Sequence, residues 1–314
     1  MFSAGVLILQ DMNHACFFSR LIFILLSGLG YTGFAQLSRP LRIMTYNILN
    51  GFEWGKEPGR QDSLGKWVLS RNPDVVALQE LCGFTEEKLL QMAQSWGHGY
   101  SVLLKEEGYP VGLSSKTPIK VKAKMLGGLW HGMLHVETAG VDFLVVHLSP
   151  SDRQFRMKEA RILRDYIETV VMPVCNHYIV LGDFNAHSPF DAGFDRKQGV
   201  LERVRTADSQ NEKYKNLLHN EFDYGVISVF LSAPLIDVIA RFITNRDRWS
   251  YPSSKWTGPP MPNPAMNKER LDYILVSPSL APNCTGTFIY NSGLTDRLSD
   301  HFPVVAEFGM STRE

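Results

Sequence analysis

Residues 177–186 are HYIVLGDFNA, and this stretch indicates both how the chain folds and where its chemistry lies. The run His177–Leu181 has the length and mostly apolar composition of a buried strand, and Gly182 follows it. Asp183 and Asn185 come next at positions i and i+2, so in an extended chain both side chains project to the same side. A buried strand that ends in an acid and an amide predicts a polar site at one edge of a sheet.

The same arrangement recurs along the chain. Polar residues stand at the ends of five other strand-like runs: Asn47 after 41–46, Glu80 after 74–79, His147 after 141–146, Asp272 before 273–276, and Asp300 with His301 before 302–308. Any one of them alone is more often a turn residue, an ion-paired acid or a hydrogen-bonded loop histidine. Carboxylates, amides and imidazoles that recur at strand ends over the whole chain indicate a shared site instead.

Outward from these motifs, strands and helices alternate, which predicts an α/β (α+β) fold. Strands are predicted at 41–48, 74–81, 100–104, 111–115, 129–137, 141–147, 177–181, 271–276 and 302–308. Helices are predicted at 60–71, 85–96, 151–171, within 213–218 and at 225–231, and a long surface loop at 249–267. Thr85 and Asp152 are the predicted N-caps of two of these helices. No linker divides residues 36–314, so they are expected to form a single domain.

Composition narrows the class of protein. The chain has 314 residues, is 44% hydrophobic and 20% charged, and balances 32 basic against 32 acidic side chains. These values are typical of a globular protein and exclude a disordered or collagen-like chain. Zero net charge removes a strongly basic surface as a reason to expect nonspecific nucleic-acid binding. Four cysteines are too few for a disulfide scaffold.

The N-terminal residues 1–35 predict a signal peptide. An apolar run, Leu21–Gly30, is followed by small residues up to Ala35, which is the layout of a cleavable export signal. Translation is expected to start at Met1 or at Met12, with cleavage after Ala35 and a secreted or periplasmic product. An uncleaved membrane anchor is the alternative, but the run is short for a span of about 20 residues. After cleavage three cysteines remain, enough for one intramolecular disulfide at most.

The polar motifs together resemble the endonuclease/exonuclease/phosphatase superfamily, which includes deoxyribonuclease I, abasic-site nucleases, neutral sphingomyelinases and inositol-polyphosphate 5-phosphatases. The resemblance runs from about Leu41 to Phe308, in family order, through Asn47, Gln79-Glu80, His147, GDFN at 182–185, Asp272-Tyr273 and SDHFP at 299–303. It implies a four-layer sandwich of two packed mixed β-sheets flanked by helices. It also implies a single catalytic domain over residues 36–314 that hydrolyses phosphate esters with a divalent cation.

The resemblance implies a metal site formed by Glu80, with Asn47 beside it and Asp300 completing the shell. The expected ion is Mg²⁺, with Mn²⁺ or Ca²⁺ as alternatives, because such hard cations take oxygen ligands. A bound cation would neutralise the phosphate and stabilise the charge that develops on it.

The catalytic roles also follow from the resemblance and from residue type. Asp183 corresponds to the residue that orients or deprotonates the attacking water. Asn185 would donate a hydrogen bond to a phosphate oxygen, which can be worth about 3 kcal/mol in the transition state. His301 and Asp272 resemble a His–Asp dyad in which the carboxylate favours the protonated imidazole. His147 would contact the phosphate or protonate the leaving oxygen.

The subfamily is less defined. The run HLSPSD at 147–152 is similar to deoxyribonuclease I, in which a glutamate supports the equivalent histidine; here Glu107, or the adjacent Glu106, is the candidate. Leu81 stands where abasic-site nucleases carry a lysine. Arg270-Leu271-Asp272 replaces the Trp-Cys-Asp-Arg signature of the 5-phosphatases.

The predicted function is therefore an exported Mg²⁺-dependent phosphoesterase, most simply a phosphodiesterase acting by metal-assisted attack of water. One alternative is a secreted nuclease on DNA or RNA, for which lysines 105, 116, 120, 122 and 124 would supply a basic patch. A second is a sphingomyelinase-like lipid phosphodiesterase, and a third is a binding protein on the same scaffold that has lost catalysis. No motif indicates a protein partner. Trp249, Tyr251 and Trp256 mark the 249–267 loop as the candidate for substrate selection.

Overall fold

The computed structural model describes residues 39–256, 258, 261 and 263–309. The predicted signal peptide, residues 1–35, lies outside these ranges, as do both candidate start residues. Among the described residues, none of the helices combines the length and the apolar character that a membrane span needs. The cysteines in this part of the chain, Cys82, Cys175 and Cys284, form no disulfide with one another.

The first of two sheets contains the first strands of the domain and the last. Its strand order is β11-β12-β1-β2-β4-β3. These strands are β1 (Leu41–Asn47), β2 (Val75–Gln79), β3 (Tyr100–Leu103), β4 (Gly112–Ser115), β11 (Cys284–Ile289) and β12 (Val304–Phe308). The β1–β2 pair is parallel and the other pairs are antiparallel, so the sheet is mixed.

The second sheet has the order β5-β6-β7-β8-β10-β9. Its strands are β5 (Lys120–Met125), β6 (Met133–Thr138), β7 (Val141–His147), β8 (Tyr178–Asp183), β9 (Ile236–Asp237) and β10 (Asp272–Val276). Only β7 and β8 run parallel within it, and the helix between them provides the crossover that a parallel pair requires.

Eight α-helical segments are described. They are α1 (Leu49–Gly55), α2 (Pro58–Arg71), α3 (Glu86–Gln94), α4 (Arg153–Tyr166), α5 (Ala192–Asp195), α6 (Val200–Gln210), α7 (Gly225–Ser232) and α8 (Val238–Phe242). Both predicted N-caps are confirmed, because the Thr85 side chain accepts a hydrogen bond from the Lys88 N–H and Asp152 accepts one from the Gln154 N–H.

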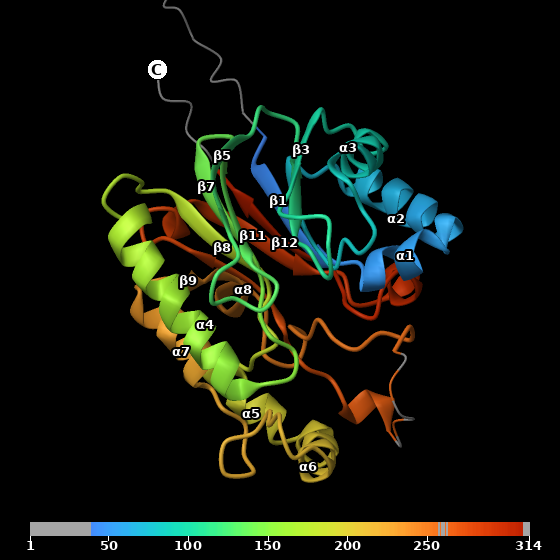
Figure 1. Cartoon of the computed structure of the whole chain (residues 1–314), viewed down its shortest axis with the longest axis vertical. Helices are drawn as coiled ribbons and strands as arrows, with labels where there is room; N and C mark the ends of the chain where they lie inside the picture. Colours follow the sequence, from blue (N-terminus) through green and yellow to red (C-terminus); the bar gives the residue numbers. More distant parts are fainter. Residues whose placement is uncertain (1–38, 257, 259–260, 262, 310–314) are drawn as a thin grey trace, which may run out of the picture. The chain divides into compact units, whose positions relative to one another are not determined.

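Alternation along the strands produces the layers. Ile43 of β1 joins Phe143 and Leu181 of the other sheet in an apolar core between the two sheets. Its neighbours Met44 and Tyr46 point the other way and pack with residues of α2 and α3, while a third core joins the second sheet to α4 and α7. Figure 1 shows α2 and α3 beside the first sheet and α4 and α7 beside the second. The predicted four-layer sandwich is confirmed.

The predicted helix within 213–218 is wrong. The Asn211 side chain accepts hydrogen bonds from the N–H groups of Lys213 and Tyr214, and the Asp208 carboxylate accepts from the N–H groups of Asn216 and Leu217. These side chains take the place of helical carbonyl acceptors, so the segment is irregular and forms no helix.

Some strands and helices were missed or placed inaccurately. β5 was not predicted: Val121, Ala123 and Met125 alternate with lysines, but most residues of the strand are exposed, so the stretch lacks the buried apolar run by which the other strands were recognised. The strand predicted from residue 129 begins only at Met133, because Gly132 has a left-handed backbone (φ 96°) that interrupts the extended chain. Helix α6 and strand β11 were not predicted either.

Candidate active site

Strand register brings three of the predicted residues to one edge of the second sheet. His147 at the end of β7 lies opposite Asp183 at the end of β8, and Asp272 at the start of β10 lies opposite Asp183 on its other side. In the first sheet, Asn47 ends β1 and pairs with Gln79, the residue before Glu80. The polar strand ends of both sheets therefore face one region of the molecule.

Gly182 sets the spacing of β7 and β8 beside this region. Its φ is 139°, and a Cβ built on it would lie 2.0 Å from the Val146 carbonyl oxygen. No side chain fits there without moving backbone, so the two strands can approach this closely only with glycine at this position. The approach fixes His147 and Asp183 next to each other.

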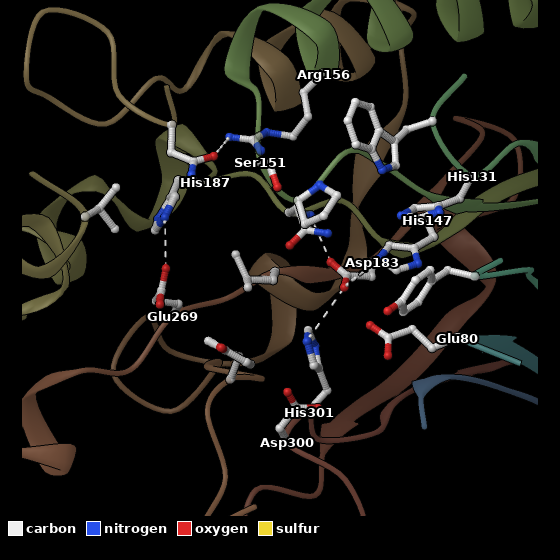
Figure 2. A pocket seen from close by; sticks show the side chains of 18 of the residues that line it. Glu80, His131, His147, Ser151, Arg156, Asp183, His187, Glu269, Asp300 and His301 are labelled. Atoms are coloured by element: carbon white, nitrogen blue, oxygen red, sulfur yellow. Dashed lines mark hydrogen bonds and ion pairs between the residues drawn. The ribbon is translucent and has the colours of Figure 1, made fainter. Parts of the chain in front are cut away.

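The Asp183 carboxylate is the centre of the site and is only 1% exposed. Its Oδ2 accepts a hydrogen bond from Asn47 Nδ2 (3.1 Å) and lies 3.5 Å from His147 Nε2 and 3.7 Å from His301 Nε2. Figure 2 shows the carboxylate between the two imidazole rings. Burial raises the pKa of Asp183, and the neighbouring His301 opposes this rise.

Asn185 lies next to this carboxylate. Its backbone N–H donates to Asp183 Oδ1 (2.9 Å), and its φ of 47° is one that asparagine tolerates better than most residues. The Asn185 side-chain Nδ2 donates one hydrogen bond to the Leu148 carbonyl (3.1 Å). An amide nitrogen carries two hydrogens, so a second donor remains for a ligand in the cavity.

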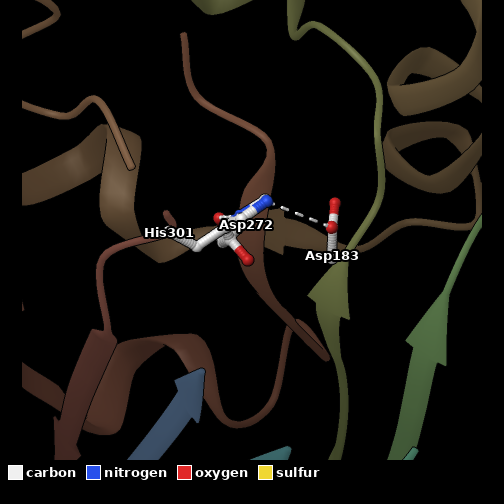
Figure 3. Close-up of side chains that lie close together, drawn as sticks. All are labelled: Asp183, Asp272 and His301. Atoms are coloured by element: carbon white, nitrogen blue, oxygen red, sulfur yellow. Dashed lines mark hydrogen bonds and ion pairs between the residues drawn. The ribbon is translucent and has the colours of Figure 1, made fainter. Parts of the chain in front are cut away.

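His301 and Asp272 form the predicted dyad. His301 Nδ1 lies 2.8 Å from Asp272 Oδ2, and Figure 3 shows the other side of the ring directed at Asp183. Burial alone would lower the pKa of His301, but the carboxylates of Asp272 and Asp183 outweigh it and raise the pKa well above its ordinary value. The imidazole is therefore held protonated, with both nitrogens facing carboxylates.

His147 has a different environment. Burial lowers its pKa to about 4, although Asp183 opposes the shift, so the ring is neutral near pH 7. Its Nδ1 is buried without a hydrogen-bond partner in the described part of the chain. The expectation that Glu107 or Glu106 supports this histidine is wrong, because both glutamates are exposed in a turn and neither bonds to it. His131 stacks on the ring instead, with centroids 4.3 Å apart.

Glu80 and Asp300 contribute two further carboxylates. Glu80 Oε1 accepts from Asn47 Nδ2 (3.1 Å), and Glu80 Oε2 accepts from the Asn50 N–H (2.7 Å). Burial raises the pKa of Asp300 and the nearby Glu80 adds to the rise, against the opposing effect of His301. The Asn47 oxygen accepts from the Leu49 N–H (3.1 Å), so its amide would have to turn over before that oxygen could bind a cation.

The backbone that holds Glu80 is unusual. Residues 50–54 of α1 all have left-handed angles, with φ between 51° and 59°, and four of these five are not glycine. Glu80 itself has a φ of 61°. Left-handed backbone costs non-glycine residues roughly 1–2 kcal/mol each and persists where surrounding contacts impose it. Here the turn directs the Asn50 N–H at the Glu80 carboxylate.

These residues open onto a cavity of about 520 Å³. Six of the eight predicted residues line the cavity: Glu80, His147, Asp183, Asn185, Asp300 and His301. The other two do not line it but hydrogen-bond to residues that do, Asn47 to Glu80 and Asp272 to His301. The opposite end of the cavity, where Figure 2 shows His187 and Glu269, was not predicted. That volume is typical of a small-molecule pocket.

The opposite end carries a buried ionic cluster. His187 Nδ1 lies 3.2 Å from an Asp195 oxygen and Nε2 lies 3.3 Å from a Glu269 oxygen, and Arg203 pairs with Glu269. Burial opposes the charged form of His187, but both carboxylates outweigh it and raise its pKa to about 9. The cluster ties the segment after β8 to the segment before β10, so it fixes the walls of the cavity.

The predicted surface loop 249–267 is partly internal. Ser250 is fully buried, and its hydroxyl accepts hydrogen bonds from the N–H groups of Leu271 and Asp272 (3.1 Å each). The Tyr251 ring packs 4.7 Å from the His301 ring. Residues 250 and 251 therefore support the dyad, and replacing the whole loop would disturb the site itself.

The predicted basic patch is largely neutralised. Lys116 lies 3.5 Å from Asp74, Lys124 lies 2.9 Å from Glu86, and Lys122 lies 3.0 Å from Glu137 and 2.8 Å from Asp142. Paired lysines offer little net positive charge to a polyanion. Of the five predicted lysines, Lys105 and Lys120 have no ion-pair partner among the described residues, and two unpaired charges fall short of the basic groove that a duplex-binding nuclease would need.

Comparison with known families identifies the chain. The sequence profile of the Endonuclease/Exonuclease/phosphatase family matches residues 44–301. The chain belongs to this family. It is accordingly a hydrolase of phosphate esters of the metal-dependent class. A sequence search of curated proteins found no match.

Solved structures share the family fold. An AP endonuclease from Archaeoglobus fulgidus has a TM-score of 0.62 and 17% identity, covering 85% of this chain and 99% of that one. The 3′-5′ exonuclease NExo from Neisseria meningitidis has a TM-score of 0.59 and 20% identity, with the same coverage. A humanised TDP2 from D. rerio has a TM-score of 0.57 and 18% identity, covering 86% and 99%. At these identities the likeness establishes the fold alone.

The donor set fits the divalent cation that the endonuclease/exonuclease/phosphatase family uses. Glu80 and Asp300 present carboxylate oxygens to the cavity, which suit a hard cation. Donor atoms of Asp183, Asp272 and His301 also lie within 4.8 Å of one another. The hydrogen-bonded, protonated His301 is a poor metal ligand, since a ligating imidazole nitrogen must be free of its proton. We therefore favour Glu80 and Asp300 as the ligands.

All eight residues predicted from the family motifs converge. A binding protein that has lost catalysis would show a broken constellation, and none is seen among the described residues of this site. Sequence inspection missed His131, Arg156, His187, Arg203 and Glu269 of the cavity lining. His187 directly follows GDFNA and Glu269 stands three residues before Asp272, so proximity to a family motif was the available signal.

Proposed function

We propose that the protein is an exported Mg²⁺-dependent phosphodiesterase that hydrolyses its substrate by attack of water. The observation that carries the proposal is the position of the Asp183 carboxylate, 3.5 Å from His147 Nε2 and 3.7 Å from His301 Nε2 at the floor of the cavity. A carboxylate and two imidazoles around one point can exchange protons with a water and a phosphate ester held there.

The protonation state of each catalytic residue determines its proposed role. Asp183 orients the water and accepts its proton, and a raised pKa brings this carboxylate closer to the basicity that a general base needs. His301, held protonated by Asp272, donates to the phosphate or to the leaving oxygen. His147 is neutral and is better suited to donating a hydrogen bond to phosphate than to protonating a leaving group.

Asn185 supplies a neutral donor. Its second amide hydrogen can reach a phosphate oxygen while the first remains bound to the Leu148 carbonyl. Mg²⁺ bound to Glu80 and Asp300 would add Lewis-acid stabilisation of the phosphate charge. Magnesium is proposed over softer ions because both ligands are carboxylates.

Hydrolysis of bis(4-nitrophenyl) phosphate tests the proposal. We expect Mg²⁺-dependent release of nitrophenol by the wild type and at least about 100-fold slower release by Asp183→Ala and His301→Ala. Asp62→Asn, at an exposed position of α2, is the matched control and should behave as the wild type. Equal rates in all four proteins would refute the proposed mechanism.

Export is proposed from residues 1–35 and has its own test. We expect the protein recovered from the medium or periplasm to begin at Gln36. A mature N-terminus at residue 1 or at Met12 would contradict cleavage. Among alternative substrates, duplex nucleic acid is disfavoured by the neutralised lysines around β5, and no described feature favours a lipid.

A further inference from the structure

A row of aromatic rings leads away from the candidate active site. The aromatic row consists of His131, Trp130, Tyr109, Trp54 and Tyr214. Ring centroids are 5.5 Å apart for Tyr109 and His131, 6.2 Å for Trp54 and Tyr109, 6.5 Å for Trp130 and His131, and 6.0 Å for Trp130 and Tyr214. His131 connects the row to the active site, because its ring stacks on His147, as Figure 2 shows.

The row is not core packing. Trp54 is 51% exposed and Tyr109 and Trp130 are each 37% exposed, and no member belongs to one of the three apolar cores. Tyr109, Trp130 and His131 line the cavity itself. Exposed rings grouped along a cavity wall are typical of a surface that binds a ligand rather than of random surface residues.

We propose that the aromatic row stacks against unpaired bases of a single-stranded nucleic acid whose phosphate enters the cavity. This inference rests on the proposed phosphodiesterase function. A phosphate held near Asp183 places the neighbouring nucleotides of its own strand against the cavity wall. Aromatic side chains that stack on successive bases are the usual means of holding an unpaired strand, because every base has a flat π-face.

The burial of the catalytic side chains favours an unpaired strand over a duplex as the ligand. Asp183 is 1% exposed and His301 is 5% exposed, so a phosphate must descend into the cavity to reach them. A flexible single strand can bend its backbone inward, whereas bases inside a duplex are paired and stacked and cannot contact the rings.

The lysines near the aromatic row also favour a single-stranded nucleic acid as the ligand. Lys122 and Lys124 of β5 are paired with carboxylates, but Lys105 and Lys213 near the row are not. Burial is the main reason that the pKa of His131 is lowered, and Lys105 is close enough to lower it further. Lys213 Nζ lies 4.7 Å from the Tyr214 ring centroid. No carboxylate of the described residues lies within ion-pair distance of either lysine. Free lysines beside stacking rings match a strand of alternating bases and phosphates.

A membrane surface fits the row less well. Rings that anchor a protein to lipid project outward from the surface, whereas three of these rings face a cavity. The edge-to-face contacts of Trp54 with Tyr109 (77°) and of Trp130 with Tyr214 (87°) also hold the rings against the protein.

Binding to strands that differ only in their bases tests the proposal. We would measure fluorescence anisotropy in MgCl₂ with two labelled phosphorothioate strands of ten units, which resist hydrolysis. One carries thymine bases, and the other has the same backbone with no bases. We expect the wild type to bind the base-bearing strand at least about tenfold tighter, since stacking of even one base is worth that ratio. The same strand annealed to its complement should bind more weakly than the single strand.

Variants separate stacking from other effects. The double variant Trp54→Ala, Trp130→Ala should lose most of the preference for bases, whereas Trp130→Tyr should keep it. Phe288→Ala is the matched control, because the exposed fraction of Phe288, 41%, lies between those of Trp130 and Trp54. Phe288 belongs to β11 and does not line the cavity. Equal affinity of the wild type for both strands, or a preference that survives the double variant, would overturn the proposal.

Two further outcomes are informative. Binding to sphingomyelin vesicles that disappears in the double variant, without discrimination between the strands, would overturn the inference in favour of a lipid surface. Failure of the proposed phosphodiesterase function can be told apart from failure of this inference. It would appear as an absence of bis(4-nitrophenyl) phosphate hydrolysis, and that assay is independent of the anisotropy measurement.

Discussion

The imidazole rings of His131 and His147 are stacked, with centroids 4.3 Å apart and an interplanar angle of 25°. No glutamate bonds to Nδ1 of His147 in the described part of the chain, and His131 instead covers the face of the ring. Because burial is the main reason that the pKa of His147 falls to about 4, the ring that covers it helps to keep it neutral.

Replacing His131 should therefore change the pH dependence of the reaction. In His131→Ala, His147 becomes hydrated and its pKa rises toward the ordinary value of 6.5. A full return would leave roughly one thirtieth of the histidine neutral at about pH 5. A protonated His147 would form an ion pair with Asp183, 3.5 Å away, and weaken it as a base, so kcat/KM there should fall up to about thirtyfold relative to its plateau. The measurement is kcat/KM for a small phosphodiester from acidic to neutral pH. His131→Phe keeps a stacked ring and is the control; identical profiles for Ala and Phe would contradict the role.

The dyad gives a second prediction. Asp272→Asn preserves the shape at Nδ1 of His301 but removes the carboxylate that contributes most to raising its pKa, so the pKa should fall and less of the imidazole should be protonated. We expect kcat for a small phosphodiester to fall about 10²–10⁴-fold, the usual contribution of a positioned acid or base. The exposed Asp62→Asn serves as the control. A decrease of less than about threefold would show that the charge on His301 is dispensable.

Metal binding can be measured without activity. A cation that binds the folded protein stabilises it, so the melting temperature of the wild type should rise with Mg²⁺ concentration. Glu80→Gln should require at least about tenfold more Mg²⁺ for the same rise, because it removes one of two charged ligands. Glu202→Gln, at a side chain that is 75% exposed, should follow the wild type. Unchanged Mg²⁺ dependence in Glu80→Gln would exclude Glu80 as a ligand.

Glu159 connects the segment that carries His131 to the segment that follows His147, and its carboxyl group should make the stability of the protein depend on pH. Its carboxylate accepts hydrogen bonds from the N–H groups of Trp130 (2.7 Å) and Ser149 (2.8 Å). Burial outweighs these bonds and raises its pKa from 4.5 to about 7. As pH rises through this window the unfolded carboxyl loses its proton first. The free energy of unfolding should then fall, by on the order of 3 kcal/mol at most.

A neutral variant isolates that contribution. Glu159→Gln cannot accept from both N–H groups, so it should be less stable than the wild type at about pH 4.5, and the difference should shrink toward about pH 7. Denaturant unfolding at several pH values provides the measurement. Glu168→Gln is the control, since that side chain is 46% exposed. A difference that stays constant or widens with pH would contradict the raised pKa.

Much of the site could be predicted because it is built on strand ends. Once Asp183 follows a buried strand and His147 and Asp272 stand at the ends of two others, pairing of those strands brings the three side chains together. The dyad of His301 and Asp272 likewise needed only residue types and family order.

Features that depend on packing between loops could not be predicted. Nothing in the order of residues indicates that His131 stacks on His147 or that α1 turns left-handed beside Glu80. The helix expected within 213–218 failed because side chains of Asn211 and Asp208 compete for its N–H groups, a local effect that composition does not show.

The contact between Gly182 and Val146 has a consequence for how this enzyme could diversify. Since the backbone of β7 and β8 sets the separation of His147 and Asp183, the reactive pair is insulated from changes in the segments that enclose the cavity. Those segments can vary in length and side chains and so admit new substrates. The distance between His147 and Asp183, on which hydrolysis depends, would stay the same.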